Sequence, residues 1–277
     1  MIVRQLKLIA TAFTFLTRFP LVARISLYEQ EDLGAAARWY PLVGIVIGAL
    51  GAGVLYGSGY IFSREVAAAI ALTCLVLATG AFHEDGLADT ADGFGGAFDP
   101  ARKLEIMKDS RIGTYGSAAL ILSLLIRWRL LMEIPIELMF VTLISAHSLS
   151  RWSAVVMVKM LPYVREGASN KPIAMGIGWK ELFIATLTVG AVSYPMWKAH
   201  VAAILLTVLV VSVMTIISRR QIAGVTGDVL GATNQIVEIA TLALWIAGVR
   251  AGLWWKLPTI PEGHPFEGVH IPPWLLQ

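Results

Sequence analysis

The sequence predicts an all-α fold, a polytopic transmembrane helical bundle with about seven or eight membrane helices. Of its 277 residues, 57% are hydrophobic and only 15% are charged, and the mean hydropathy is +0.70. These values lie far outside the range of soluble globular domains. Apolar stretches long enough to cross about 30 Å of hydrocarbon as helices recur along the chain. We therefore expect residues 1–277 to form a single integral membrane domain.

Seven segments have the length and polarity of a membrane-spanning helix: 41–62, 65–83, 114–133, 136–158, 181–199, 200–217 and 229–250. An eighth, 6–22, carries Lys7 and Arg18 and ends at Pro20, so it either spans the membrane or lies in the interface or re-enters. The proline-rich tail at 257–277 is expected to be irregular and extracytoplasmic. The lone Cys74 excludes an intramolecular disulfide framework.

Positive charge predicts the orientation of these spans. If they alternate, most Lys and Arg residues fall on one side of the membrane, together with the loops at 84–113, 159–180 and 218–228. By the positive-inside rule this side is cytoplasmic. We expect a multi-pass protein of the cell membrane whose active-site loop, 84–113, faces the cytoplasm. No basic stripe with interleaved aromatic residues is present, so no nucleic acid partner is expected.

The most informative run, FHEDGLADTADGFGG at 82–96, follows a long apolar segment. At about 100° per residue, Asp85, Asp89 and Asp92 fall within roughly 60° of one helix face. Carboxylates pointing one way repel each other unless a cation lies among them. Oxygen ligands without cysteine suit Mg²⁺ or Mn²⁺ better than zinc. A solvated charged turn is the other interpretation, but such turns rarely keep acidic residues in phase.

A second unusual passage is GVTGDVLGATNQIVEIATLALW at 224–245. Glu238 is a carboxylate about three turns inside a predicted span, where it should face a wet or metal-bearing cavity. Asp228 opens the same span and is either a site residue or a helix N-cap. Gly231 and Asn234 fit close helix packing and polar contacts between helices.

Several other residues are candidates for phosphate binding or proton transfer. Lys108 and Arg111 can donate charge-assisted hydrogen bonds to phosphate, and a short amphipathic helix that begins at Asp99 would carry them to the membrane surface. His83 is either a proton carrier or metal ligand, or an interfacial hydrogen-bonding residue. Arg127 lies well inside a predicted span, where it either snorkels outward or serves a site.

Three motifs together resemble the cobalamin synthase family of adenosylcobinamide-GDP ribazoletransferases. They are HEDGLADTADG at 83–93, LEIMKDSR at 104–111 and GDVLGA at 227–232, supported by FLTRFP at 15–20 and YPLVG at 40–44. The resemblance implies that α-ribazole, or its 5′-phosphate, attacks the cobinamide-linked phosphate of adenosylcobinamide-GDP, that GMP leaves, and that Mg²⁺ is required. The chain departs from the family pattern at Glu84, where an apolar residue is usual, and at Gln235, where an acidic one is expected.

The resemblance, taken with the spacing, implies roles for individual residues. The expected metal ligands are Asp85, Asp89, Asp92, Asp228 and Glu238. The expected catalytic residues are Asp85, Asp89, Asp92, Asp109 and Asp228, and the general base stays open among Asp228, Glu238, Asp109 and His83. The expected substrate-binding residues are His83, Lys108, Arg111, Gly86 and Gly93. The partners are the two substrates and the lipid bilayer, and assembly as a homo-oligomer is compatible with the sequence.

Two other classes of protein compete with this interpretation. A CDP-alcohol phosphotransferase carries a D-x-x-D-G fragment that 89–93 matches, but the remainder of that signature is missing. A cation-coupled secondary transporter would use intramembrane carboxylates near the middle of the membrane. The acidic cluster of this chain is predicted at the cytoplasmic rim, which favours the enzyme.

Overall fold

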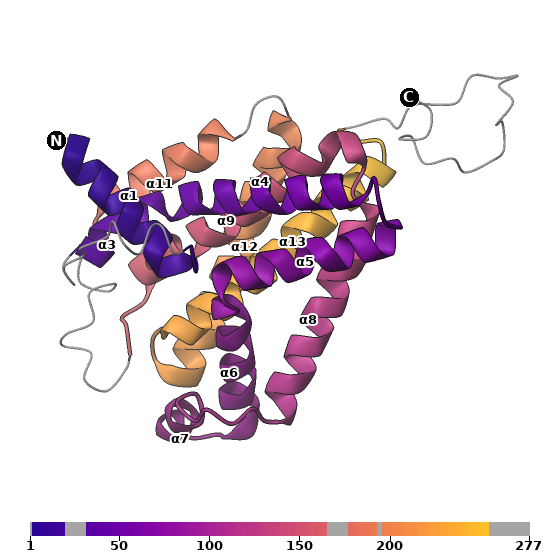
Figure 1. Ribbon diagram of the computed structural model, residues 1–277. Helices are drawn as coiled ribbons and strands as arrows, with labels where there is room; N and C mark the ends of the chain where they lie inside the picture. Colours follow the sequence, from indigo (N-terminus) through magenta and orange to yellow (C-terminus); the bar gives the residue numbers. More distant parts are fainter. Residues whose placement is uncertain (1, 20–31, 165–176, 193–195, 255–277) are drawn as a thin grey trace, which may run out of the picture.

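The computed structural model describes residues 2–19, 32–164, 177–192 and 196–254, and this part of the chain is helical without any strand (Figure 1). An isolated bridge joins Tyr163 to Val225. In chain order the helices are α1 (Ile2–Leu16), α3 (Asp32–Ala36), η1 (Ala37–Trp39), α4 (Tyr40–Ser58), α5 (Arg64–Thr79), α6 (Phe82–Gly96), α7 (Pro100–Ile106), α8 (Thr114–Glu133), η2 (Ile136–Leu138), α9 (Met139–Met160), α11 (Trp179–Ala191), α12 (Trp197–Ile222) and α13 (Gly227–Arg250).

The predicted all-α polytopic fold is confirmed, with fewer full-length spans than expected. Five helices in the described ranges are long and apolar enough to cross a membrane, or six if the bent pair α5 and α6 is one span. The expected spans at 6–22 and 181–199 correspond to α1 and α11, which comprise 15 and 13 residues. Both are shorter than the roughly 20 residues that a spanning helix needs. The expected tail at 257–277 lies outside the described residues.

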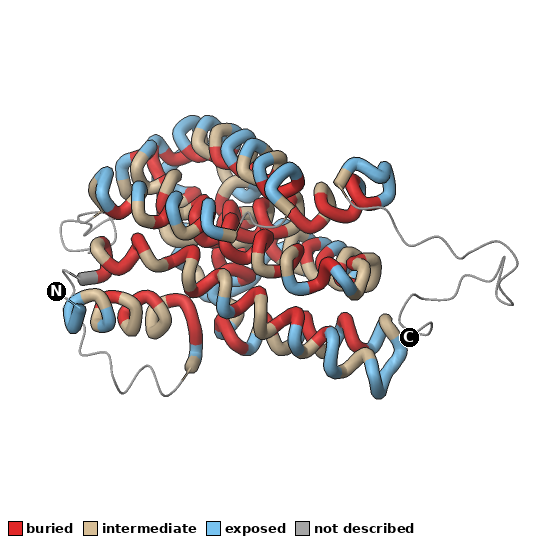
Figure 2. The backbone as a smooth tube through the Cα atoms, turned by 90° about the horizontal axis from the view of Figure 1, so that it is seen from above, coloured by how far each residue is buried: buried red, intermediate tan, exposed pale blue. Residues whose placement is uncertain are grey.

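Buried residues line the faces that the helices turn toward one another, and exposed residues lie outside (Figure 2). Many exposed residues are large and apolar, including Leu122 and Leu125 of α8 and Leu205 and Leu209 of α12. Side chains of this kind suit a hydrocarbon environment. The most extensive packing joins α4 to α9, where a Cβ atom on Gly44 would lie 2.2 Å from the carbonyl oxygen of His147.

A sharp bend separates α5 from α6. Gly80 and Ala81 have φ angles of +67° and +57°, which end α5 in the left-handed region, and the two helix axes meet at 85°. The acidic run therefore does not continue the preceding apolar helix. It forms α6, a separate helix that extends away from α5, with α7 beyond it (Figure 1).

Turns that carry the candidate residues meet at one end of the bundle. The amide of Val164, just after α9, donates to the carbonyl of Val225 at 2.9 Å, between α12 and α13. Lys103 of α7 contacts the side chain of Gln221, at the end of α12. The loops at 84–113 and 218–228 are therefore neighbours, as the alternation of charge predicts, and the described start of the loop at 159–180 joins them.

Candidate active site

Helices α6 and α13 cross with their backbones in contact. A Cβ atom on Gly86 would lie 2.8 Å from the carbonyl oxygen of Asp228 and 3.1 Å from its Cα atom, and Gly231 packs on the same glycine. Only small residues allow so close an approach. Asp228 therefore lies beside Gly86, which is next to Asp85 and one helical turn from Asp89. The backbone of Asp228 thus approaches the acidic run as predicted, and a shared metal site stays a prediction.

Asp85 and Asp89 lie on the side of α6 between the face that packs on α13 and the face that packs on α8. At about 100° per residue, Asp89 is about 60° and Asp85 about 100° around the helix from Gly86, in the same direction. Asp85 is exposed and Asp89 is half-buried. Both carboxylates are thus accessible from outside while remaining next to the crossing with α13.

Asp92 is in phase with the other two aspartates, but both its oxygens are engaged by α8. Its Oδ2 accepts the amide of Gly113 at 2.7 Å and its Oδ1 accepts the amide of Gly116 at 2.8 Å. Amides at a helix start have no partner within their own helix, and a carboxylate there also favours the helix dipole. Asp92 therefore fastens the start of α8 to α6, a role that its spacing alone does not reveal.

The acidic residues near the crossing fit a hard divalent cation in chemical type. Asp85, Asp89 and Asp228 supply carboxylate oxygens, which Mg²⁺ prefers, and Gly86 brings the two helices into contact. Over the residues described here, no three His, Cys, Asp or Glu side chains are arranged closely enough to hold a metal ion as they stand. The ligand set is near one place but is not preassembled.

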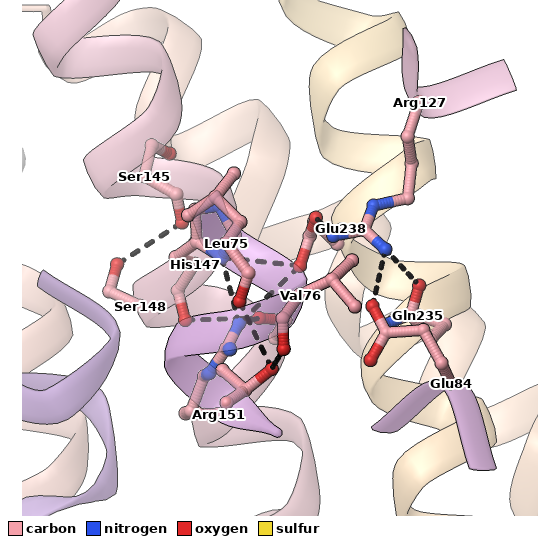
Figure 3. A network of polar contacts seen from close by, with 12 residues as sticks. Leu75, Val76, Glu84, Arg127, Ser145, His147, Ser148, Arg151, Gln235 and Glu238 are labelled. Carbon is pink, nitrogen blue, oxygen red and sulfur yellow. Dashed lines mark hydrogen bonds and ion pairs between the residues drawn. The ribbon is translucent and has the colours of Figure 1, made fainter. Parts of the chain in front are cut away.

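Glu238 belongs to a buried polar network instead of the acidic cluster, which corrects its expected place among the metal ligands. Its Oε1 lies 2.9 Å from Arg127 Nη2, and its Oε2 lies 3.2 Å from His147 Nδ1 and 3.4 Å from Arg151 Nη1 (Figure 3). All four side chains are nearly inaccessible. A carboxylate whose two oxygens already face cationic side chains has its charge compensated without a metal ion.

The same network continues to α6. Arg127 Nη1 donates to Glu84 Oε1 at 2.7 Å and to Gln235 Oε1 at 3.0 Å, and Gln235 Nε2 donates to Glu84 Oε1 at 3.1 Å (Figure 3). Arg127 therefore does not snorkel to the membrane surface. It joins α8 to α6 and α13 inside the bundle.

Asp109 and Arg111 pair with each other at the surface. Arg111 Nη2 donates to Asp109 Oδ2 at 2.6 Å, and the backbone amide of Arg111 donates to Oδ1 at 3.0 Å. Hydrogen bonds from Arg111 lower the pKa of Asp109 to about 2, and the same pairing raises the pKa of Arg111. A carboxylate with so low a pKa is a weak base, so Asp109 does not suit the proton-accepting role.

Three further expected substrate contacts lie on packed surfaces. Gly86 faces the backbone of α13, and a Cβ atom on Gly93 would lie 2.4 Å from Met107 Cγ. His83 is buried and lies about 160° around α6 from Asp85. These residues shape and hold α6, and the structure does not place them on the open side that carries Asp85 and Asp89.

Comparison with known proteins identifies the family. The family model for cobalamin-5-phosphate synthase matches residues 8–246. The chain belongs to the cobalamin-5-phosphate synthase family. It is 42% identical over 253 residues to an adenosylcobinamide-GDP ribazoletransferase of Shewanella amazonensis, covering 87% of this chain and 97% of that protein. Enzymes of the same name from Shewanella frigidimarina and Ralstonia pickettii are 39% and 38% identical, and cover 88% and 85% of this chain and 95% and 92% of their own lengths. No solved structure gives a significant match.

Membership of the cobalamin-5-phosphate synthase family decides against the CDP-alcohol phosphotransferase and the transporter. Glu84 and Gln235, the two positions at which the sequence is expected to depart from the family, contact each other. Sequence reasoning missed Arg151 and His147, which both bind Glu238. The available signal was HSLSRWS at 147–153, a polar run inside an expected span, where charged residues mark interior positions.

Proposed function

We propose that this chain joins α-ribazole, or its 5′-phosphate, to adenosylcobinamide-GDP with release of GMP, the last assembly step of cobalamin. We further propose that it does so in the cell membrane with the site facing the cytoplasm, and that Mg²⁺ is held by Asp85, Asp89 and Asp228. The family match carries the proposed reaction, and the backbone contact between Gly86 and Asp228 carries the proposed metal site. This contact brings together the segments of α6 and α13 that carry Asp85, Asp89 and Asp228.

Phosphoryl transfer asks a protein mainly for positioning and charge neutralisation. An oxygen of the ribazole hydroxyl bonds to the cobinamide-linked phosphorus, and the bond from that phosphorus to the oxygen of GMP breaks. Mg²⁺, when bound, neutralises the diphosphate and the charge that develops on the leaving oxygen. Asp85 and Asp89 are suited to hold it because Asp85 is exposed and Asp89 is only half-buried, and Asp228 lies on the second helix beside Gly86.

The remaining expected bases are poorly placed for the proton of the attacking hydroxyl. Glu238 is held by two arginines, Asp109 has a pKa of about 2, and His83 is buried. We therefore expect this proton to leave to water or to a carboxylate of the crossing. Lys108 lies just after α7, where a cation can steady the diphosphate.

The direct test is GMP release by detergent-purified protein supplied with adenosylcobinamide-GDP, α-ribazole and Mg²⁺. We expect release to require all three components. A Glu105→Gln variant provides the control, because Glu105 is an exposed acid near the site that pairs with Arg102 on α7 and should not affect turnover. Release that does not depend on α-ribazole would contradict the proposed reaction.

Orientation is tested separately by cysteine labelling in a Cys74→Ala background. Cysteines at Asp99 and Arg220 should be labelled only after the membrane is opened, whereas a cysteine at Tyr60 should be labelled from outside intact cells. Asp99 and Tyr60 are exposed, so access does not limit the reaction. Labelling of Asp99→Cys from outside would place the site on the other side of the membrane.

A further inference from the structure

The buried network contains a nearly symmetrical pair of side chains around one guanidinium group. Glu84 of α6 and Gln235 of α13 each present an Oε1 atom to Arg127 Nη1, at 2.7 and 3.0 Å, and they hydrogen-bond to each other at 3.1 Å. Figure 3 shows the two side chains converging on Arg127 from different helices. Glutamate and glutamine have the same shape, so either position could supply the carboxylate to this guanidinium.

The charges in the network balance. Glu84 and Glu238 supply two carboxylates, and Arg127 and Arg151 supply two guanidinium groups. Each of these side chains has at most 5% of its surface exposed. Removing or adding one negative charge therefore leaves an uncompensated charge inside the bundle, which is strongly unfavourable.

The position of Glu84 on α6 links this balance to the acidic site. Glu84 precedes Asp85 and is tied to Arg127 of α8, while Asp92 binds the start of the same helix α8. These two attachments, eight residues apart in number, fasten α6 to α8 on either side of Asp89. The segment between them carries Asp85, Gly86 and Asp89.

We propose that Glu84 is a positioning residue that holds α6 by supplying the anion required by Arg127, and that position 235 can supply this anion in its place. Glu84→Gln leaves the network with one excess positive charge, and Gln235→Glu leaves it with one excess negative charge. The double variant exchanges the amide and the carboxylate between two side chains that are already in contact. It restores the balance with the same number of heavy atoms.

The test is a cycle of four proteins: the unchanged chain, Glu84→Gln, Gln235→Glu and the double variant. Each is purified in detergent, and its yield and thermal melting midpoint are measured, which does not depend on the proposed function. We expect each single variant to melt about 5–10 °C lower and the double variant to recover most of this loss. If a single variant does not accumulate, accumulation of the double variant counts as recovery.

A matched control is Glu133→Gln at the end of α8 that is opposite to the end bound by Asp92. Glu133 also bridges two arginines, Arg129 at 2.8 Å and Arg250 at 2.5 Å, but their side chains are 58% and 68% exposed. We expect its melting midpoint to change by less than about 2 °C. A double variant at 84 and 235 that melts or accumulates no better than Glu84→Gln would overturn the proposal.

A second set of measurements, of steady-state kinetics, rests on the proposed function and tests whether Glu84 positions α6 for catalysis. Glu84→Gln should lower kcat roughly tenfold with KM for adenosylcobinamide-GDP within about twofold, and the double variant should regain most of kcat. If the unchanged chain releases no GMP, the proposed function fails while the melting cycle still decides the pairing. If the double variant recovers its stability without regaining kcat, the positioning role is overturned.

Discussion

Among the helix crossings of the described residues that bring backbones into contact at a glycine, the crossing of α4 with α9 and that of α6 with α13 differ in what surrounds the glycine. Where α4 meets α9, Cβ atoms on Gly44 and Gly48 would lie 2.2 and 2.5 Å from carbonyl oxygens of α9. Where α6 meets α13, a Cβ atom on Gly86 would lie 2.8 Å from the carbonyl oxygen of Asp228. The neighbours of the first pair include Val43 and Ile47, which are fully buried.

The neighbours of Gly86 include two acidic residues, Asp85 before it in the chain and Asp228 across the crossing. Close packing at α4 and α9 joins buried apolar surfaces, whereas the same packing at α6 and α13 brings the segment with Asp85 and Asp89 near Asp228. The comparison teaches that a glycine contact between helices acquires a functional meaning from the residues beside it. Substitutions at the two crossings should accordingly separate loss of folding from loss of activity.

The largest effect is expected for Gly44→Ala. The added methyl group would meet the backbone of His147, which cannot move aside without separating α4 from α9, so we expect a cost of about 3 kcal/mol or more. The measurement is the yield of monodisperse protein in detergent. Gly53→Ala on the same helix is the control, because nothing lies within 4 Å of a Cβ atom there. Equal yields from the two variants would contradict this account of the crossing.

Asp89→Asn and Asp228→Asn should lower activity without lowering the yield of protein. We expect GMP release to fall roughly a hundredfold or more, because each substitution removes charge from the proposed metal site. Mg²⁺ titration provides the second measurement. The residual activity of both variants should require more Mg²⁺ than the unchanged protein. A variant with normal turnover at limiting Mg²⁺ would exclude that aspartate from the ion's ligands.

Gly86→Ala should give an intermediate result that tests the crossing itself. Its methyl group would press on the Asp228 backbone and displace α6 by a few tenths of an ångström. Such a shift should lower activity, because the residues of an active site must be held within about 0.5 Å of their productive positions. We expect the protein to accumulate and kcat to fall about tenfold. A fall in yield as severe as that of Gly44→Ala would show that both crossings serve the scaffold equally.

The smallest effect is expected for Asp109→Asn. Arg111 holds the pKa of Asp109 at about 2, below that of an unpaired carboxyl group. The stability that this ion pair contributes to the folded protein is therefore present above about pH 4 and is lost only as the pH falls toward 2. Activity and its pH profile between pH 5 and 9 should therefore match those of the unchanged protein within about twofold. Loss of activity together with the acidic limb of the profile, where a general base becomes protonated, would restore Asp109 as a general base.

The helices and the acidic run could be predicted because both depend on local patterns. Apolar length marks α4, α8, α9, α12 and α13, and the spacing of Asp85 and Asp89 fixes their common side of α6. The bend at Gly80 and Ala81 was not predicted, because a left-handed alanine leaves no mark in composition. For the same reason the expected span at 65–83 ran past the point at which α5 ends.

The partners of the buried charges could not be predicted from the sequence. Glu238 is expected to bind metal as long as its surroundings are unknown, since an isolated carboxylate in a membrane needs some cation. Arg127 and Arg151 supply the positive charge from two other helices. No local sequence pattern specifies that these side chains contact Glu238. Gly86 and Gly93 were likewise expected to bind substrate because the contacts that make them packing residues come from α13 and α7.

The buried network also has an order in time, because its members leave the ribosome in sequence. Glu84 on α6 is made first, Arg127 on α8 and Arg151 on α9 follow, and Glu238 on α13 comes last. Until α13 is made, the part of the network already synthesised contains two guanidinium groups, of Arg127 and Arg151, and one carboxylate, of Glu84. Among the described helices, the last to be synthesised thus brings both the neutralising charge and Asp228, so the buried network and the proposed metal site are completed by the same helix.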